Sequence, residues 1–264
     1  MIKALFFDID GTLVSFNTHT IPQSAVDALS AAKARGVQIF ISTGRAQLLI
    51  NNLGPLQERG LIDGYITMNG ACCFAADGTL ISKMPISRSS AEAILHYTWD
   101  RNITCVVVYG QDACVCRCGQ ELRDLFYRAL QCPVTFDDVT VDEALRRGDI
   151  YQLSPFIDAA QEAELRPSVT DCEIGRWHPA FVDVTALGCT KQKGISDIIN
   201  HFGIALEETM SFGDGGNDIP MLRYAHTGVA MGNALPEVKA AADYVTTSVD
   251  DDGVALALRH FGII

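Results

Sequence analysis

Two acidic, glycine-containing segments of this sequence each follow a short apolar run. Asp8 and Asp10 come directly after the apolar residues 4–7, in the segment DIDGTL. Asp214 comes after the predicted strand at residues 209–212, in the segment GDGGND. Neighbouring carboxylates repel one another, and burial adds to that cost, which a divalent cation offsets. Because hard carboxylate oxygens suit Mg²⁺, the two segments together predict a magnesium site at Asp8, Asp10 and Asp214.

A third segment, STGR, supplies the kinds of donors that a phosphoryl group needs. It follows the predicted buried strand at residues 37–41 and combines the Thr43 hydroxyl, the Gly44 backbone N–H and the Arg45 guanidinium. Lys191 precedes a predicted helix and would supply local positive charge that the acidic surface does not provide. The alternative for Lys191 is an ordinary solvated lysine beside Lys193.

Composition limits the classes of partner. The chain has 264 residues, is 48% hydrophobic, and carries a formal net charge of -12. Such an acidic surface repels nucleic-acid phosphates, so we expect no nucleic-acid partner. No apolar run approaches the roughly 18 to 20 residues of a membrane span, and Asp8 and Asp10 interrupt the N-terminal apolar run. We therefore expect no membrane partner and a cytoplasmic location.

The 9 cysteines predict free thiols rather than a disulfide framework, because their number is odd and the chain is long. Cys114, Cys116 and Cys118 alternate and would share one face of a strand. A soft-metal site there is the alternative, although the Cys-x-x-Cys spacing of common zinc motifs is missing.

Apolar runs and helical patterns alternate at both ends of the chain, which is typical of a parallel βαβ sheet. The predicted strands there are residues 4–7, 37–41, 65–68, 209–212, 228–231 and 244–246. The predicted helices are residues 22–35, 46–53, 193–202, 219–224 and 238–242. Between them the order is mixed, with strands at 106–109 and 113–117 and helices at 90–99 and 121–130. We predict an α/β fold, a doubly wound, Rossmann-like parallel-sheet core (1–82 and 184–264) with an inserted α+β cap domain (83–183).

These motifs, in this order, resemble the haloacid dehalogenase-like superfamily, and specifically its Cof-type sugar-phosphate phosphatase branch. The resemblance covers essentially the whole chain, including the segments MNGA at residues 68–71 and VAMGNA at residues 229–234. It implies hydrolysis of a small phosphorylated metabolite, such as a hexose phosphate, with Mg²⁺ as cofactor. The oligomeric state does not follow from it.

The resemblance also implies residue roles. Asp8 would be the nucleophile that forms an aspartyl-phosphate, and Asp10 the general acid and then base. Mg²⁺ would be held by the Asp8 carboxylate, the Asp10 backbone carbonyl and Asp214. Asp218 would support these ligands from behind.

The phosphate donors implied by the resemblance are Thr43, with the neighbouring Gly44 N–H, and Asn217. Lys191 would be the phosphate lysine, because its distance from Gly213 through the intervening helix fits that register. A lysine followed by glycine is usual in the family, which leaves Lys193 as the alternative.

The cap segment EIGRWH at residues 173–178 is the candidate for substrate selection, and Arg176 is its candidate substrate ligand. Packing of Trp177 in the cap and pairing of Arg176 with Glu173 is the alternative. Three other functions stay open: a phosphomutase, a non-catalytic metabolite-binding protein, and a dehalogenase, which would need no magnesium. Arg45 is a further candidate substrate contact, unless it pairs with an acid instead.

Overall fold

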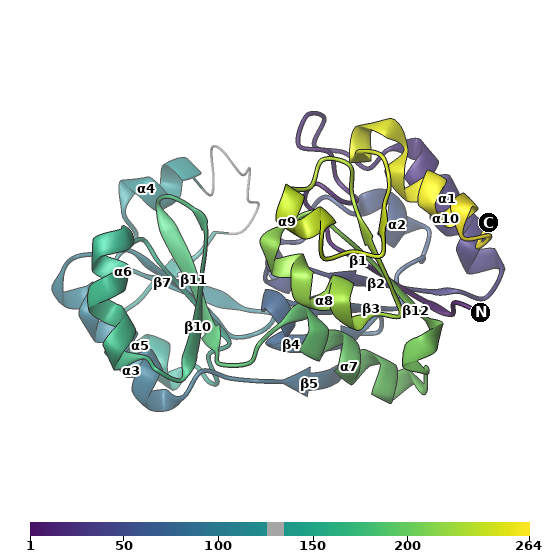
Figure 1. Cartoon of the computed structure of the whole chain (residues 1–264). Helices are drawn as coiled ribbons and strands as arrows, with labels where there is room; N and C mark the ends of the chain where they lie inside the picture. Colours follow the sequence, from purple (N-terminus) through teal and green to yellow (C-terminus); the bar gives the residue numbers. More distant parts are fainter. Residues whose placement is uncertain (126–134) are drawn as a thin grey trace. The chain divides into compact units, whose positions relative to one another are not determined.

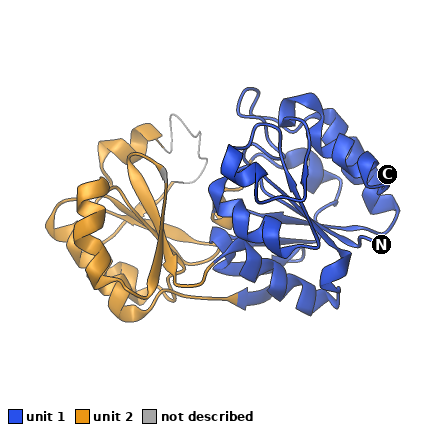
Figure 2. Ribbon diagram, viewed as in Figure 1, with its two compact units in different colours: residues 1–45, 52–82, 190–264 blue, residues 46–51, 83–189 orange. Residues whose placement is uncertain are grey.

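The computed structural model describes residues 1–125 and 135–264, except the side chain of Trp177. Contacts divide the chain into two compact units (Figure 2). Unit 1 comprises residues 1–45, 52–82 and 190–264, and unit 2 comprises residues 46–51 and 83–189. The sequence placed the return to the core at residue 184. In the structure the strand that ends the insert continues to Ala186, and residues up to Cys189 pack with unit 2.

Unit 1 contains an eight-stranded sheet. Its first six strands in spatial order are parallel to one another, and the seventh is antiparallel to the sixth. The spatial order is β14 (Tyr244–Val245), β13 (Thr227–Ala230), β12 (Thr209–Gly213), β1 (Ala4–Phe7), β2 (Gln38–Ser42), β3 (Gly64–Thr67), β4 (Cys72–Ala75) and β5 (Leu80–Lys83). The sequence analysis did not predict β4 and β5. The predicted parallel-sheet core is confirmed.

Helices cover both faces of this sheet, as a doubly wound fold requires (Figure 1). The helices of unit 1 are α1 (Gln23–Ala34), α2 (Gly54–Glu58), α7 (Lys191–Phe202), α8 (Ile219–Tyr224), α9 (Pro236–Lys239) and α10 (Gly253–His260). α1 contacts α10, and α7 contacts α8 as well as β2, β3 and β4. Alternation along β1 sends Phe6 to stack on Phe40 and Phe7 to stack on Phe212. The central strands are therefore buried on both faces.

One predicted helix of the core is wrong. Residues 46–53 form only a short 3₁₀ turn, Gln47–Leu49, and the helix begins later at Gly54. Pro55 occupies the first turn of α2, where a missing N–H costs nothing, so the helix starts there. α7 in contrast begins two residues before its predicted start, because the Thr190 hydroxyl accepts a hydrogen bond from the Lys193 N–H.

Unit 2 is a six-stranded sheet with helices, which confirms the mixed character of the insert. Its spatial order is β10 (Cys172–His178), β11 (Phe181–Ala186), β9 (Gln152–Pro155), β6 (Cys105–Val108), β7 (Ala113–Cys116) and β8 (Asp137–Asp138). Its helices are α3 (Arg88–Asp100), α4 (Gln120–Leu122), α5 (Val141–Arg146) and α6 (Ala159–Leu165). The first half of the predicted helix at 121–130 overlaps α4, and its residues 126–130 lie outside the described residues.

The alternating cysteines of unit 2 lie on β7 and in the residues after it. Cys114 and Cys116 are buried on β7, and Cys118 follows the strand; all three are free thiols. In the described part of the chain, these thiols do not converge with any third ligand. Burial raises the pKa of the Cys116 thiol to about 12, which keeps it protonated and inert. These three cysteines are therefore free thiols, as expected from the sequence.

Candidate active site

The carboxyl ends of β1, β2, β3 and β12 meet at one edge of the sheet in unit 1. The parallel register pairs Phe7 with Phe212 and with Ile41, so the residues after these strands emerge side by side. Asp8 continues the ladder by donating its N–H to the Phe212 carbonyl at 3.0 Å. In open parallel sheets this edge is where ligands bind.

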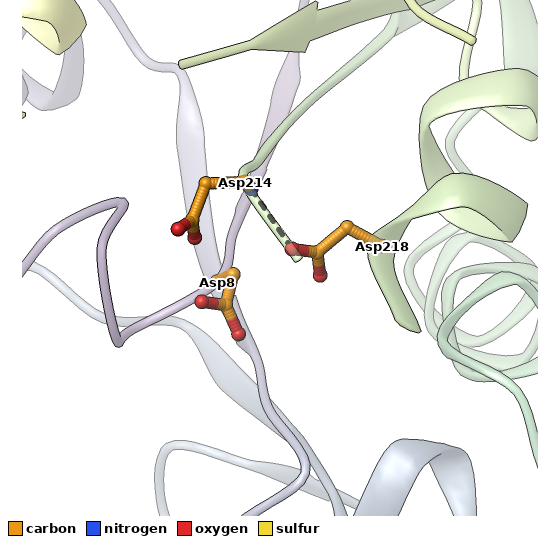
Figure 3. Close-up of side chains that lie close together, drawn as sticks. All are labelled: Asp8, Asp214 and Asp218. Atoms are coloured by element: carbon orange, nitrogen blue, oxygen red, sulfur yellow. Dashed lines mark hydrogen bonds between the residues drawn. The ribbon is translucent and has the colours of Figure 1, made fainter. Parts of the chain in front are cut away.

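Three carboxylates converge there (Figure 3). One oxygen each from Asp8, Asp214 and Asp218 lies within 4.8 Å of the others. Asp8 is 7% exposed and Asp218 is fully buried, whereas Asp214 is half-buried. Three acids at this spacing repel one another unless positive charge lies between them.

Lys191 supplies part of that charge. Its Nζ lies 2.5 Å from Oδ1 of Asp8 and 2.5 Å from Oδ1 of Asp218, and the side chain is fully buried. Burial by itself would lower the pKa of Lys191, but attraction to Asp218 and Asp8 outweighs it and raises the pKa above its ordinary value. Lys191 is therefore a fixed ammonium. Lys193 points elsewhere and forms an ion pair with Asp197 on the helix surface.

Asp218 is a support rather than a free ligand. Its Oδ2 accepts the N–H groups of Asp214 at 2.9 Å and Gly215 at 2.8 Å, while its Oδ1 accepts from Lys191. A Cβ on Gly213 would lie 2.5 Å from the Asp218 Cβ, so glycine is needed for this approach. Both oxygens of Asp218 are thus occupied by donors that fix the loop after β12.

Asp214 is held by two residues that the sequence analysis did not assign. The Thr12 hydroxyl donates to its Oδ1 at 3.0 Å, and Asn233 Nδ2 donates to its Oδ2 at 3.2 Å. Asn233 also donates to the Gly11 carbonyl at 2.8 Å. The segment containing Asn233 was visible in the sequence as part of the resemblance, but nothing local linked it to Asp214.

Burial and the neighbouring carboxylates raise the pKa values of Asp8 and Asp214. Burial raises the pKa of Asp8, and the charges of Asp218 and Asp10 add to that effect, while Lys191 opposes it. Burial, followed by the charge of Asp218, raises the pKa of Asp214 to about 6. Two cationic side chains lie among the carboxylates of the site, Lys191 and Arg45. The carboxylates number four, namely Asp8, Asp10, Asp214 and Asp218, so with all of them ionised the site carries two surplus negative charges.

Asp10 lies just beyond this cluster and pairs with Arg45. Arg45 Nε donates to Oδ2 of Asp10 at 2.8 Å, and Nη2 donates to Oδ1 at 2.7 Å. This fork-to-fork geometry is the strongest form of an arginine–carboxylate pair. The alternative in which Arg45 pairs with an acid is therefore the one that the structure displays.

The STGR segment forms a tight turn at the end of β2. The Thr43 hydroxyl accepts the Arg45 N–H at 3.0 Å, and the Thr43 N–H extends the sheet to the Ile66 carbonyl. Asn217 reaches this turn from the loop after β12 and donates its Nδ2 to Oδ1 of Asn69 at 3.1 Å. Thr43, Gly44 and Asn217 thus lie at the same sheet edge as the carboxylates.

Arg176 belongs to unit 2 and is fully engaged within it. Its guanidinium donates to Glu162 at 3.0 and 3.1 Å, and to the carbonyls of Ile157 and Pro179 at 3.0 Å each. The pairing partner is Glu162 rather than Glu173. A substrate contact by this guanidinium would require breaking some of these bonds.

The carboxylates fit a hard divalent cation. The second oxygen of Asp8, Oδ2, accepts no hydrogen bond from a described residue, and Asp214 lies beside it. A doubly charged cation would balance the two surplus negative charges, and carboxylate oxygens are the ligands that Mg²⁺ prefers. The chemistry of the donor set therefore fits the implied ion.

The fold and this site define a phosphatase of the haloacid dehalogenase type. A haloacid dehalogenase-like hydrolase model matches residues 5–258, and the chain belongs to that family. It is 32% identical over 265 residues to the putative phosphatase YkrA of Bacillus subtilis, covering 99% of this chain and 98% of the relative. It is 29% identical to the 5-amino-6-(5-phospho-D-ribitylamino)uracil phosphatase YcsE of Bacillus subtilis, covering 98% and 96%.

Solved structures agree with this assignment. The sugar phosphatase BT4131, of subclass IIB of the same superfamily, superposes with a TM-score of 0.91 at 54% identity, covering 99% of this chain and all of that one. The phosphatase BT1666 from Bacteroides thetaiotaomicron superposes with a TM-score of 0.87 at 36% identity, covering 100% and 96%. Within the described residues, none of the helices has the length and apolarity to cross a membrane.

Proposed function

We propose that this phosphatase hydrolyses a sugar phosphate, most naturally a hexose phosphate, with Mg²⁺ and through an aspartyl-phosphate on Asp8. One observation carries the proposal. Asp8 has one oxygen held by the buried ammonium of Lys191, while its other oxygen accepts no hydrogen bond from a described residue and lies beside Asp214. A carboxylate oriented in this way, with one oxygen available at the ligand-binding edge of the sheet, is a nucleophile in position.

The ion would be held by the Asp8 carboxylate, the Asp10 backbone carbonyl and Asp214. When bound, it offsets the repulsion between Asp8 and the phosphoryl group and stabilises the transferring charge. Lys191 keeps Asp8 in one orientation, and Asp218 keeps Lys191 in place.

The proposed reaction has two steps, formation and then hydrolysis of the aspartyl-phosphate. Asp8 Oδ2 bonds to phosphorus as the ester P–O bond breaks, and Asp10 gives its proton to the departing sugar oxygen. Asp10 then takes a proton from water, whose oxygen attacks phosphorus and releases Asp8 and inorganic phosphate. Arg45 donates one hydrogen bond to each oxygen of Asp10. The oxygen that carries the proton must release its bond to Arg45 before it donates, while the other oxygen keeps Asp10 oriented on Arg45.

Thr43, Gly44 and Asn217 are proposed to hold the phosphoryl oxygens, because their donors lie at the same edge as Asp8. The inserted unit 2 is proposed to act as the cap that selects the leaving group. The sugar assignment is supported by the 54% identity to a sugar phosphatase. A cytoplasmic location is proposed on the free thiols of the described cysteines.

The test is phosphate release from hexose, pentose and triose phosphates, nucleotides and p-nitrophenyl phosphate, with Mg²⁺ and with a chelator. We expect release only with Mg²⁺ and the highest kcat/KM with hexose phosphates. A different preferred ester would correct the substrate alone. Release without any divalent cation would remove the metal from the proposal. No release from any ester, with isomerised sugar phosphate detected, would favour the phosphomutase; binding without turnover would favour a binding protein.

A further inference from the structure

The turn after β3 has an unusual backbone. Met68, Asn69 and Gly70 all have positive φ, at 49°, 53° and 95°. Glycine adopts such angles freely and asparagine tolerates them, but for a bulky residue such as methionine they are an outlier. Met68 is also fully buried. Strain of this kind persists only where the surroundings impose it, and it gathers at functional sites.

The backbone of this turn holds the segment that contains the proposed phosphate donors. The Met68 N–H donates to the Arg45 carbonyl and the Asn69 N–H donates to the Thr43 carbonyl, both at 3.0 Å. A Cβ on Gly70 would lie 2.3 Å from the Thr190 carbonyl oxygen, which precedes Lys191. The turn is therefore wedged between the Thr43 segment and the start of α7.

The side chain of Asn69 joins two separate loops of the site. Its Oδ1 accepts from Nδ2 of Asn217, a residue 148 positions away on the loop after β12. A Cβ on Gly44 would lie 3.3 Å from Asn69 Nδ2 and 3.7 Å from Asn217 Nδ2, so both amides border the Gly44 backbone. An amide NH₂ has two hydrogens. With one given to Asn69, the orientation of the Asn217 amide is set and its second hydrogen is left for a ligand.

We propose that Asn69 is a positioning residue for phosphate binding. It orients Asn217 through its side chain, and its strained turn fixes the Thr43–Gly44 backbone donors. The inference rests on the proposed function in that the anion bound at this edge is a phosphoryl group. It goes beyond that function by assigning a role to a residue that contacts neither the nucleophile nor the carboxylate cluster in the structure.

The test compares Asn69→Gly, Asn217→Ala and the double variant. Glycine keeps the left-handed backbone and removes only the amide, so the fold is preserved. We expect each single variant to raise KM and the dissociation constant of inorganic phosphate about five- to tenfold, with kcat changed less than about twofold. The double variant should lose no more phosphate affinity than either single variant, because the two amides act together. Asn102→Gly is the matched control, since Asn102 is an exposed asparagine of unit 2 with φ of 56°.

Phosphate binding is measured by calorimetry in Mg²⁺, separately from turnover, so the inference and the proposed function fail in different ways. Absence of phosphate release by the unaltered enzyme would refute the proposed function, while the calorimetric comparison would still decide the role of Asn69. Unchanged phosphate affinity in Asn69→Gly overturns the inference. Additive losses in the double variant overturn it as well, as does an equal loss in Asn102→Gly.

Discussion

Arg45 and Asp10 form a two-pronged ion pair, with Nε–Oδ2 at 2.8 Å and Nη2–Oδ1 at 2.7 Å. The pair is only partly covered, since the two side chains are 29% and 36% exposed. Solvent therefore screens it, and its contribution to folding is small. Its consequence is geometric, because it fixes the proposed proton donor in one orientation beside Asp8.

Substitutions of Arg45 and Asp10 separate orientation of the proton donor from proton transfer itself. Arg45→Ala should lower kcat about tenfold, because Asp10 loses its fixed orientation but keeps its carboxyl group. Asp10→Asn removes the proton donor and should lower kcat at least about a hundredfold relative to the control variant. The control is Arg59→Ala, which breaks an exposed pair with Asp27 and a long hydrogen bond to the Ser30 hydroxyl, both away from the site. Equal losses for Arg45→Ala and Asp10→Asn, in steady-state kinetics, would show that Arg45 does more than orient Asp10.

Replacing the proposed nucleophile tests the mechanism directly. Asp8→Asn should reduce phosphate release by at least about a thousandfold, because the amide cannot form the aspartyl-phosphate. The variant should remain folded, since Lys191 keeps its contact with Asp218. Circular dichroism checks the fold, and Asp27→Asn on the surface of α1 serves as the matched control. Retained turnover in Asp8→Asn would exclude Asp8 as nucleophile.

The two neighbouring lysines should behave very differently on substitution. Lys191→Met leaves Asp8 and Asp218 buried without their shared cation, which should destabilise the protein by about 3–5 kcal/mol. Lys193→Met removes a partly exposed i,i+4 pair with Asp197 on α7 and should cost less than about 1 kcal/mol. Urea unfolding of both variants measures the difference. Comparable destabilisation by the two would mean that Lys191 does not sit between the acids.

The raised pKa of Asp214 predicts how pH affects the metal-free protein. Its pKa is raised from 3.8 to about 6 in the folded chain, so folding takes up a proton between these values. The protonated Asp214 therefore adds roughly 2 to 3 kcal/mol to the free energy of unfolding below about pH 4. This contribution is lost as the pH rises through 6. Unfolding in the presence of a chelator at pH 5 and pH 7, compared with Asp214→Asn, isolates the effect.

The same proton competes with the metal. Mg²⁺ affinity, measured by calorimetry, should weaken as pH falls below about 6, because a protonated Asp214 is a poor ligand. Asp214→Asn should stabilise the metal-free protein at pH 7 and lose Mg²⁺ binding. A variant that still binds Mg²⁺ as tightly as the unaltered protein would place the ion elsewhere.

The local sequence was enough to predict the core of the fold. Short, mostly apolar runs precede Asp8, Thr43 and Asp214 and predict buried parallel strands. A parallel sheet brings the carboxyl ends of such strands to one edge, regardless of the segments that connect them. The class of chemistry followed from the residue types at that edge. Within the family resemblance, the spacing to Gly213 favoured Lys191 over Lys193, and the structure puts Lys191 between Asp8 and Asp218.

Pairings between distant segments were decided by the tertiary structure alone. Asn233 holds Asp214, Asn69 meets Asn217, and Arg176 pairs with Glu162 instead of Glu173. No periodicity in the chain encodes such contacts, because they depend on which loops the sheet brings together and on space left by glycines such as Gly44. Positive φ at Met68 is equally invisible in the sequence, since tertiary contacts impose it against the local preference of the residue.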